Sequence, residues 1–91
     1  MDCEAKGKIV EELEGRFGTL QNGNDWEKRV YVIEISQKYK QKMMFSMFSF
    51  DGPIQDPIEV GESVKINFIV EAHQYNGKWY NEVKVTRVEK V

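Results

Sequence analysis

The chain has 91 residues, a formal net charge of −2 and 41% hydrophobic residues, which indicates one small folded domain over residues 1–91 and excludes a disordered chain or a second domain. Its longest uncharged run, residues 43–50, is far shorter than the roughly 20 residues of a membrane-spanning helix, so we expect no membrane partner. The amino terminus lacks the apolar core of a signal peptide, and Cys3 has no second cysteine to pair with, which predicts a reducing, cytoplasmic location.

The first predicted element is a curved strand over residues 4–13. It contains the apolar pair Ile9-Val10 shortly after Gly7, and a glycine within a strand commonly marks a bulge or a sharp coil. The following segment, residues 14–25, holds three glycines and two asparagines and is predicted to be a long loop. Its Asn22-Gly23 pair could form a turn, but the residues before that pair do not show a clear strand pattern.

The second and third strands are predicted from alternating apolar residues. Residues 26–35, WEKRVYVIEI, are rich in β-branched and aromatic side chains, which is typical of a strand. After a polar turn over residues 36–42, the run MMFSMFSF at residues 43–50 alternates in the same way. Residues 51–62 contain both prolines of the chain, which excludes a long helix and leaves room for one helical turn at most.

The last two strands are predicted as one long hairpin around the dipeptide Asn76-Gly77. Asn-Gly supplies the two positive φ values of a type I′ turn, and both flanking runs, residues 64–75 and 78–91, alternate. The resulting register pairs Tyr75 with Lys78, Val70 with Val83, and Phe68 with Val85. The apolar side chains of both strands are therefore expected on one face.

Five strands with an irregular break between the third and the fourth predict an all-β fold, a five-stranded antiparallel OB-fold barrel of the kind that binds oligonucleotides and oligosaccharides. An SH3-like barrel is the alternative, but the gap followed by two long final strands favours the OB order. The expected core is one parity of these strands: Tyr31, Ile33, Phe45, Met47, Phe68, Val70, Val83 and Val85.

Short sequence motifs, spread over nearly the whole chain, resemble those of a known family. They are Gly7-Lys8-Ile9, Trp26 with Lys28, Phe45-Ser46-Met47-Phe48, Val60-Gly61-Glu62 and Asn76-Gly77-Lys78-Trp79-Tyr80. Together they resemble a small bacterial family of unknown-function proteins that is similar to single-stranded DNA-binding OB-fold proteins. The resemblance implies an OB barrel with a surface for single-stranded nucleic acid.

The sequence offers little for enzymatic chemistry. With one histidine, one cysteine and no HxH, CxxC or HExxH spacing, we expect no metal, no cofactor, no small-molecule substrate and no catalysis. His73 would face solvent near the hairpin tip, opposite Tyr80. Glu71 would oppose Glu82, and an exposed carboxylate pair relieved by nearby Lys84 explains this arrangement better than general acid–base chemistry does.

The candidate site is the outer face of the second and third strands, where OB-folds bind single strands. The formal net charge is +3 for residues 26–50 and +2 for residues 77–91. It is −3 for residues 1–25 and −4 for residues 51–76. Cations bind phosphates and exposed aromatics stack on bases. The cations that these segments place around the second and third strands and on the last hairpin are Lys28, Arg29, Lys38, Lys40, Lys42, Lys78 and Lys84. The predicted nucleic-acid-binding residues are Trp26, Lys28, Lys42, Met44, Phe48, Tyr75, Lys78, Trp79 and Lys84.

Two functional interpretations follow from these features. The first is a non-enzymatic, sequence-tolerant binder of single-stranded nucleic acid, with DNA favoured over RNA as the partner. The second is a protein-interaction or self-assembly module on an OB barrel, because an apolar outer face can be the seam of a homodimer. The acidic segments favour the second interpretation, and the seam would contain Val30, Val32, Met44, Phe48 and Ile69.

Overall fold

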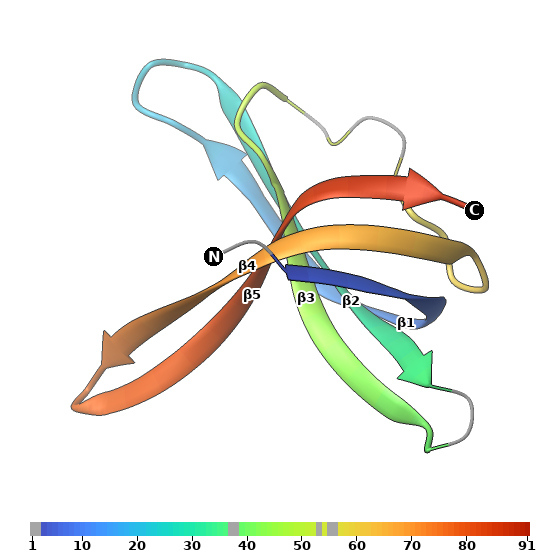
Figure 1. Ribbon diagram of the computed structural model, residues 1–91. Helices are drawn as coiled ribbons and strands as arrows, with labels where there is room; N and C mark the ends of the chain where they lie inside the picture. Colours follow the sequence, from blue (N-terminus) through green and yellow to red (C-terminus); the bar gives the residue numbers. More distant parts are fainter. Residues whose placement is uncertain (1–2, 37–38, 53, 55–56) are drawn as a thin grey trace.

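The structure, a computed structural model, describes residues 3–36, 39–52, 54 and 57–91. These residues form five strands and no helix: β1 (Cys3–Thr19), β2 (Asp25–Ser36), β3 (Gln41–Ser49), β4 (Ser63–Tyr75) and β5 (Lys78–Lys90). The tip of the β4–β5 hairpin, drawn in orange, projects away from the other strands (Figure 1). Within the described residues, no helix is long and apolar enough to cross a membrane.

The five strands close into a barrel in the order β1-β2-β3-β5-β4. Strand β1 is shared between two neighbours, because residues 3–8 pair with β4 and the strand from Lys8 onward pairs with β2. This sharing requires the curvature that was predicted for the first strand. The ring closes through one parallel pair, Ser46 with Lys84, while the other ladders are antiparallel. The predicted five-stranded barrel is therefore present, with this one parallel contact added.

The β4–β5 hairpin has the predicted turn and the predicted register. Asn76 and Gly77 have φ values of 52° and 79°, as a type I′ turn requires. Tyr75 opposes Lys78, and the ladder continues through the pairs Val70 with Val83 and Phe68 with Val85. Because the two-residue turn leaves only one way to pair the strands, this register was determined locally.

Strand β1 is longer than predicted, and the prediction of a loop over residues 14–25 is wrong for its first half. The strand runs to Thr19, with register shifts between Ile9 and Glu11 and between Leu13 and Arg16. A Cβ at Gly15 would lie only 2.4 Å from the Lys28 carbonyl oxygen, so this glycine permits close strand approach rather than a loop. The Asn22-Gly23 pair does form the turn to β2, closed by Gly23 N–H donating to Leu20 O at 3.0 Å.

The core contains four of the predicted residues and several more from β1 and β4. Its buried members are Ile9, Tyr31, Ile33, Phe45, Ile58, Val64, Ile66 and Phe68, with Met47, Val83 and Val85 packed against them. Val70 was predicted to be in the core, but it is 45% exposed. Among the described residues the last β1–β4 pair joins Cys3 to Phe68, so Val70 lies beyond the described part of that ladder.

The segment between β3 and β4 is held against the barrel by polar contacts to β2. Gly52 N–H donates to Asp25 O at 2.9 Å, and Ile54 N–H donates to a Glu27 carboxylate oxygen at 2.9 Å. Further along, the Ile58 side chain is 1% exposed and completes the core. None of the described residues in this segment is helical, so the single helical turn that the sequence allowed is absent from them.

Glu27 should make the fold sensitive to acid. The Ile54 N–H lowers the pKa of the Glu27 carboxyl, and the Arg29 guanidinium 3.2 Å away lowers it further. A carboxyl whose pKa is lower in the folded state stabilises the fold above its unfolded value of about 4.3, and this contribution is lost as the pH falls through the folded value. We expect Glu27→Gln to flatten the acid limb of a plot of urea midpoint against pH. An unchanged acid limb would contradict this assignment.

Candidate nucleic-acid interface

A groove of about 690 Å³ crosses the outer face of β2 and β3 and is bounded by the β4–β5 hairpin. Its β-sheet wall comes from side chains that the registers place on one face. Lys28 opposes both Arg16 on β1 and Phe48 on β3, and Val30 opposes Ser46. The lining contains Arg16, Lys28, Val30, Met44, Ser46, His73, Tyr75, Tyr80, Asn81, Glu82 and Val83. We refer to this cavity as the groove.

The second wall is the hairpin tip, whose two faces differ. Tyr75 and Tyr80 line the groove and are 69% and 53% exposed. The registers place Lys78 opposite Tyr75 and therefore on the same face of the hairpin. Trp79 opposes Gln74 and lies on the other face, because successive side chains of a strand point to opposite sides. The structure thus separates Trp79 from the other predicted residues of the tip.

Two predicted lysines converge on one aromatic ring. The ammonium nitrogens of Lys28 and Lys84 each lie 5.3 Å from the centroid of the Phe48 ring, which is within the range of a cation–π contact. Phe48 in turn stacks on Phe50 with a centroid separation of 6.2 Å and an interplanar angle of 9°. An aromatic platform between two cations is therefore the centre of the candidate interface.

Both lysines at this platform are paired with carboxylates from the hairpin. Lys28 Nζ lies 2.9 Å from Glu82 Oε2, and Lys84 Nζ lies 3.1 Å from Glu71 Oε2. His73 Nε2 is 3.6 Å from an oxygen of each glutamate of the cross-strand pair Glu71 and Glu82. The predicted relief of this carboxylate pair by Lys84 is confirmed, and Lys28 and His73 contribute to the same cluster.

The remaining predicted cations are spread over several surfaces. Lys42 opposes Glu34 near the β2–β3 turn and does not line the groove. Lys40 lies in that turn with a φ of 51°, and Lys38 lies outside the described residues. Arg29 alternates to the inner side of β2, where it pairs with Glu27 and with Glu12 at 3.5 Å. Sequence position alone therefore overstated how many cations line the groove.

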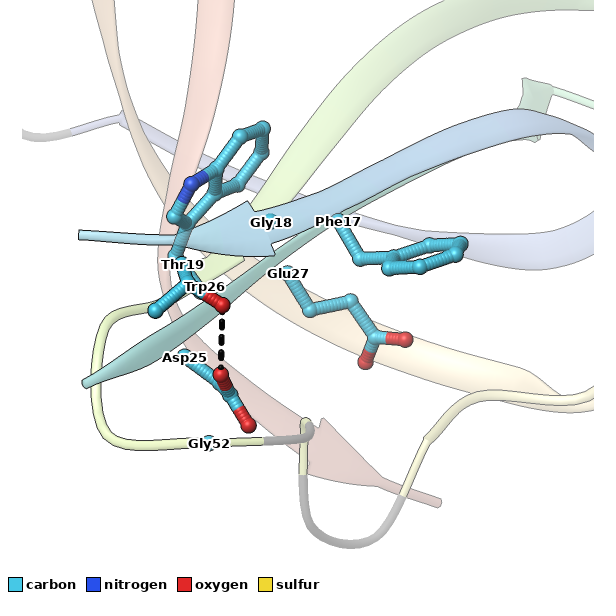
Figure 2. A pocket seen from close by; sticks show the side chains of 7 residues that line it. All are labelled: Phe17, Gly18, Thr19, Asp25, Trp26, Glu27 and Gly52. Atoms are coloured by element: carbon cyan, nitrogen blue, oxygen red, sulfur yellow. Dashed lines mark hydrogen bonds between the residues drawn. The ribbon is translucent and has the colours of Figure 1, made fainter. Parts of the chain in front are cut away.

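Trp26 lies at the end of the groove face, beside a second cavity of about 510 Å³ that Phe17, Gly18, Asp25 and Glu27 also line. A Cβ at Gly18 would lie 2.8 Å from Trp26 Nε1, so the absent side chain is what allows the indole to pack across β1. Figure 2 shows the indole on one side of the β1–β2 ladder, with the Asp25 and Glu27 carboxylates on the other. Thr19 donates a hydrogen bond to Asp25 at 3.0 Å and closes this end of the ladder.

Arg16, His73 and Tyr80 line the groove but were not among the predicted binding residues. Arg16 was missed because its segment was predicted as a loop, whereas a register shift brings it opposite Lys28. Tyr80 could have been found from the hairpin register, because it opposes His73 and shares the face of Tyr75. Within the described part of the chain, no three His, Cys, Asp or Glu side chains are grouped so as to hold a metal ion.

Solved structures with the same architecture are OB-folds. The second OB-fold domain of replication protein A from Methanococcus maripaludis superposes with a TM-score of 0.67 at 9% identity, covering 100% of this chain and 84% of that one. The mitochondrial single-stranded DNA binding protein Rim1 from S. cerevisiae superposes with a TM-score of 0.63 at 15% identity, covering 100% of this chain and 95% of that one. At these identities the likeness shows the fold, so the OB-fold prediction is confirmed.

A search of curated protein sequences gives no match. A family model described as a domain of unknown function, DUF3127, matches residues 4–89. This match covers nearly all of the chain. It agrees with the family resemblance that the short sequence motifs indicate. The protein is therefore a member of the DUF3127 family with an OB-fold.

Proposed function

We propose that this protein binds single-stranded nucleic acid in the groove without catalysing a reaction, and that DNA is favoured over RNA. The observation that carries the proposal is the Phe48 ring with two ammonium groups 5.3 Å from its centroid, on the sheet face that forms the groove. The likeness to a mitochondrial protein named for binding single-stranded DNA supports the choice of DNA.

The groove, together with Phe48 and Lys84 on the adjoining sheet face, combines the two contributions that sequence-tolerant binding needs. Bases can stack on Phe48, Tyr75 and Tyr80, and each base–aromatic contact is worth roughly 1 to 3 kcal/mol. Phosphates can bind Lys28 and Lys84 once these lysines exchange their carboxylate partners, and Arg16 has no ion-pair partner among the described residues. Trp26 and Lys78 extend the same face at its two ends.

The proposal is tested by fluorescence anisotropy of a labelled single-stranded oligonucleotide at two salt concentrations. We expect binding that weakens as salt rises, because bound counterions are released from the phosphates. Lys78→Gln should weaken binding to all sequences alike and lower the salt slope by up to about 0.7, the value for one phosphate of a single strand. The absence of binding at low salt, or binding without a salt slope, would refute the proposal.

Glu82 should oppose binding, because its carboxylate occupies Lys28 at 2.9 Å and would lie close to an incoming phosphate. We expect Glu82→Gln to increase oligonucleotide affinity about threefold to fivefold, since an ion pair of this exposure is worth up to roughly 1 kcal/mol. Anisotropy titrations at low salt measure the change. The matched control is Glu89→Gln, which removes the same charge from an exposed position on β5 outside the groove lining. Equal gains in both variants would show a general charge effect instead.

Self-assembly is a second candidate function, because Met44 is 58% exposed within an otherwise half-buried apolar patch of the sheet face. The predicted seam residues Val30, Val32, Phe48 and Ile69 are each partly buried. Light scattering at high protein concentration distinguishes the candidates. A dimer that Met44→Glu dissociates would support assembly through this face, whereas a monomer that binds oligonucleotide would argue against it.

A further inference from the structure

A β-bulge in β5 turns Arg87 to the outer surface of the barrel. Phe68 opposes Val85 and the next pair is Asn67 with Arg87, which leaves Thr86 as the extra residue. The Thr86 hydroxyl donates to Asn67 O at 3.2 Å and holds the bulge. Both Val85 and Val88 pack against the core, so the bulge gives Arg87 the outward position. Strict alternation from Val85 would instead have pointed Arg87 inward.

Arg87 borders a separate cavity of about 340 Å³ that also includes the Phe48 platform. This cavity lies next to the single parallel pair, Ser46 with Lys84, that joins β3 to β5. Met47, Val85 and Val88 supply apolar lining from the side of the core, while Arg87 and Lys90 supply cations. Phe48 thus lies between the groove and the 340 Å³ cavity that Arg87 borders.

The guanidinium of Arg87 differs from the nearby lysine ammonium groups in its ion pairing. Lys28 and Lys84 are paired with Glu82 and Glu71, and Lys90 Nζ lies 3.5 Å from Glu62. Arg87 is exposed and has no ion-pair partner among the described residues. A guanidinium without a carboxylate partner can bind a phosphate without first exchanging an existing contact.

We propose that Arg87 and this cavity form a second nucleotide subsite, in which the guanidinium binds a backbone phosphate and a base covers the apolar lining. The inference rests on the proposed function and extends the path of the single strand from the groove, past Phe48, to the far side of β3. Tyr80 and Arg87 are seven residues apart on β5, which is roughly 23 Å at about 3.3 Å per residue. A short oligonucleotide held by Tyr75 and Tyr80 at the hairpin end of the groove would not reach Arg87.

The test is a series of labelled oligothymidylates of about 4 to about 16 nucleotides, the range of site sizes of OB-folds. For the wild-type protein we expect affinity to rise with length. Arg87→Gln should bind the shortest strand as the wild type does but lose about tenfold to a hundredfold for the longest, as expected for one charge-assisted hydrogen bond. Its salt slope with the longest strand should fall by about 0.7.

Two further variants separate a phosphate contact from other effects. Lys6→Gln removes the same charge from an exposed position on β1 and should leave the length dependence intact. Arg87→Lys keeps the charge and should keep the salt slope, and thermal melting checks that each variant is folded. If Arg87→Gln matches Lys6→Gln at every length, the second subsite is refuted while the groove proposal stands. If the wild-type protein binds none of the strands, both proposals are refuted.

Discussion

Phe48→Ala is expected to weaken the binding of a single-stranded oligonucleotide about tenfold or more. The Phe48 ring centroid lies 5.3 Å from the ammonium groups of Lys28 and Lys84, and the ring stacks on Phe50. A base stacked on an aromatic side chain is worth roughly 1 to 3 kcal/mol, and the cation–π contacts of both lysines are lost with the ring. Anisotropy titration at low salt measures the loss.

The matched control for this prediction is Trp79→Ala. Trp79 is 68% exposed and aromatic, but the hairpin register places it on the face opposite to Tyr75 and Tyr80. Its removal should change affinity by less than about twofold, because a contact absent from the groove contributes no stacking energy there. If Trp79→Ala weakens binding as much as Phe48→Ala does, the single strand follows a different face of the hairpin.

Phe45→Ala should have the largest effect on stability, lowering the free energy of unfolding by roughly 3 to 5 kcal/mol. Phe45 is 1% exposed and its ring centroid lies 5.7 Å from that of Tyr31, at the centre of the core. A loss of this size removes a large fraction of the roughly 5 to 15 kcal/mol that stabilises a typical domain. Urea unfolding followed by tryptophan fluorescence measures it.

Met44→Ala is the control, because it changes the neighbouring residue on the opposite face of the same strand. Met44 is 58% exposed, and its truncation should lower the free energy of unfolding by less than about 1 kcal/mol. The contrast between the two variants tests the alternation of β3 directly. Comparable losses would mean that the inner and outer faces of this strand have been assigned incorrectly.

The strands whose identity depends on local pattern were predictable. β2, β3 and the β4–β5 hairpin follow from alternation and from one Asn-Gly turn, and the structure reproduces their pairing. The same method failed at Gly15 and Gly18, which were interpreted as loop residues. In the structure a Cβ at Gly15 would collide with the Lys28 carbonyl, and one at Gly18 would collide with the Trp26 indole. Both glycines permit close contacts with residues distant in sequence, which a local pattern does not reveal.

The candidate site was less predictable than the fold, because its electrostatics depend on contacts between distant residues. Lys28 and Lys84 both lie beside Phe48, but a count of charges along the chain could not show that Glu82, 54 residues from Lys28, pairs with one of them. Arg87 was not predicted to be part of the site. The extra residue of the bulge, Thr86, turns the Arg87 side chain to the outer face, which alternation along the strand does not predict.

The sequence by itself determined the class of fold, the hairpin register and the residue types available for binding, because alternation, turn chemistry and composition act over a few neighbouring residues. Only the tertiary structure decided which of those residues share the groove and which cations are already paired. It also decided that Val70 is exposed, because Val70 lies beyond Phe68, where the β1–β4 pairing of the described residues ends. Closure of the barrel sets these outcomes, and it depends on all five strands at once.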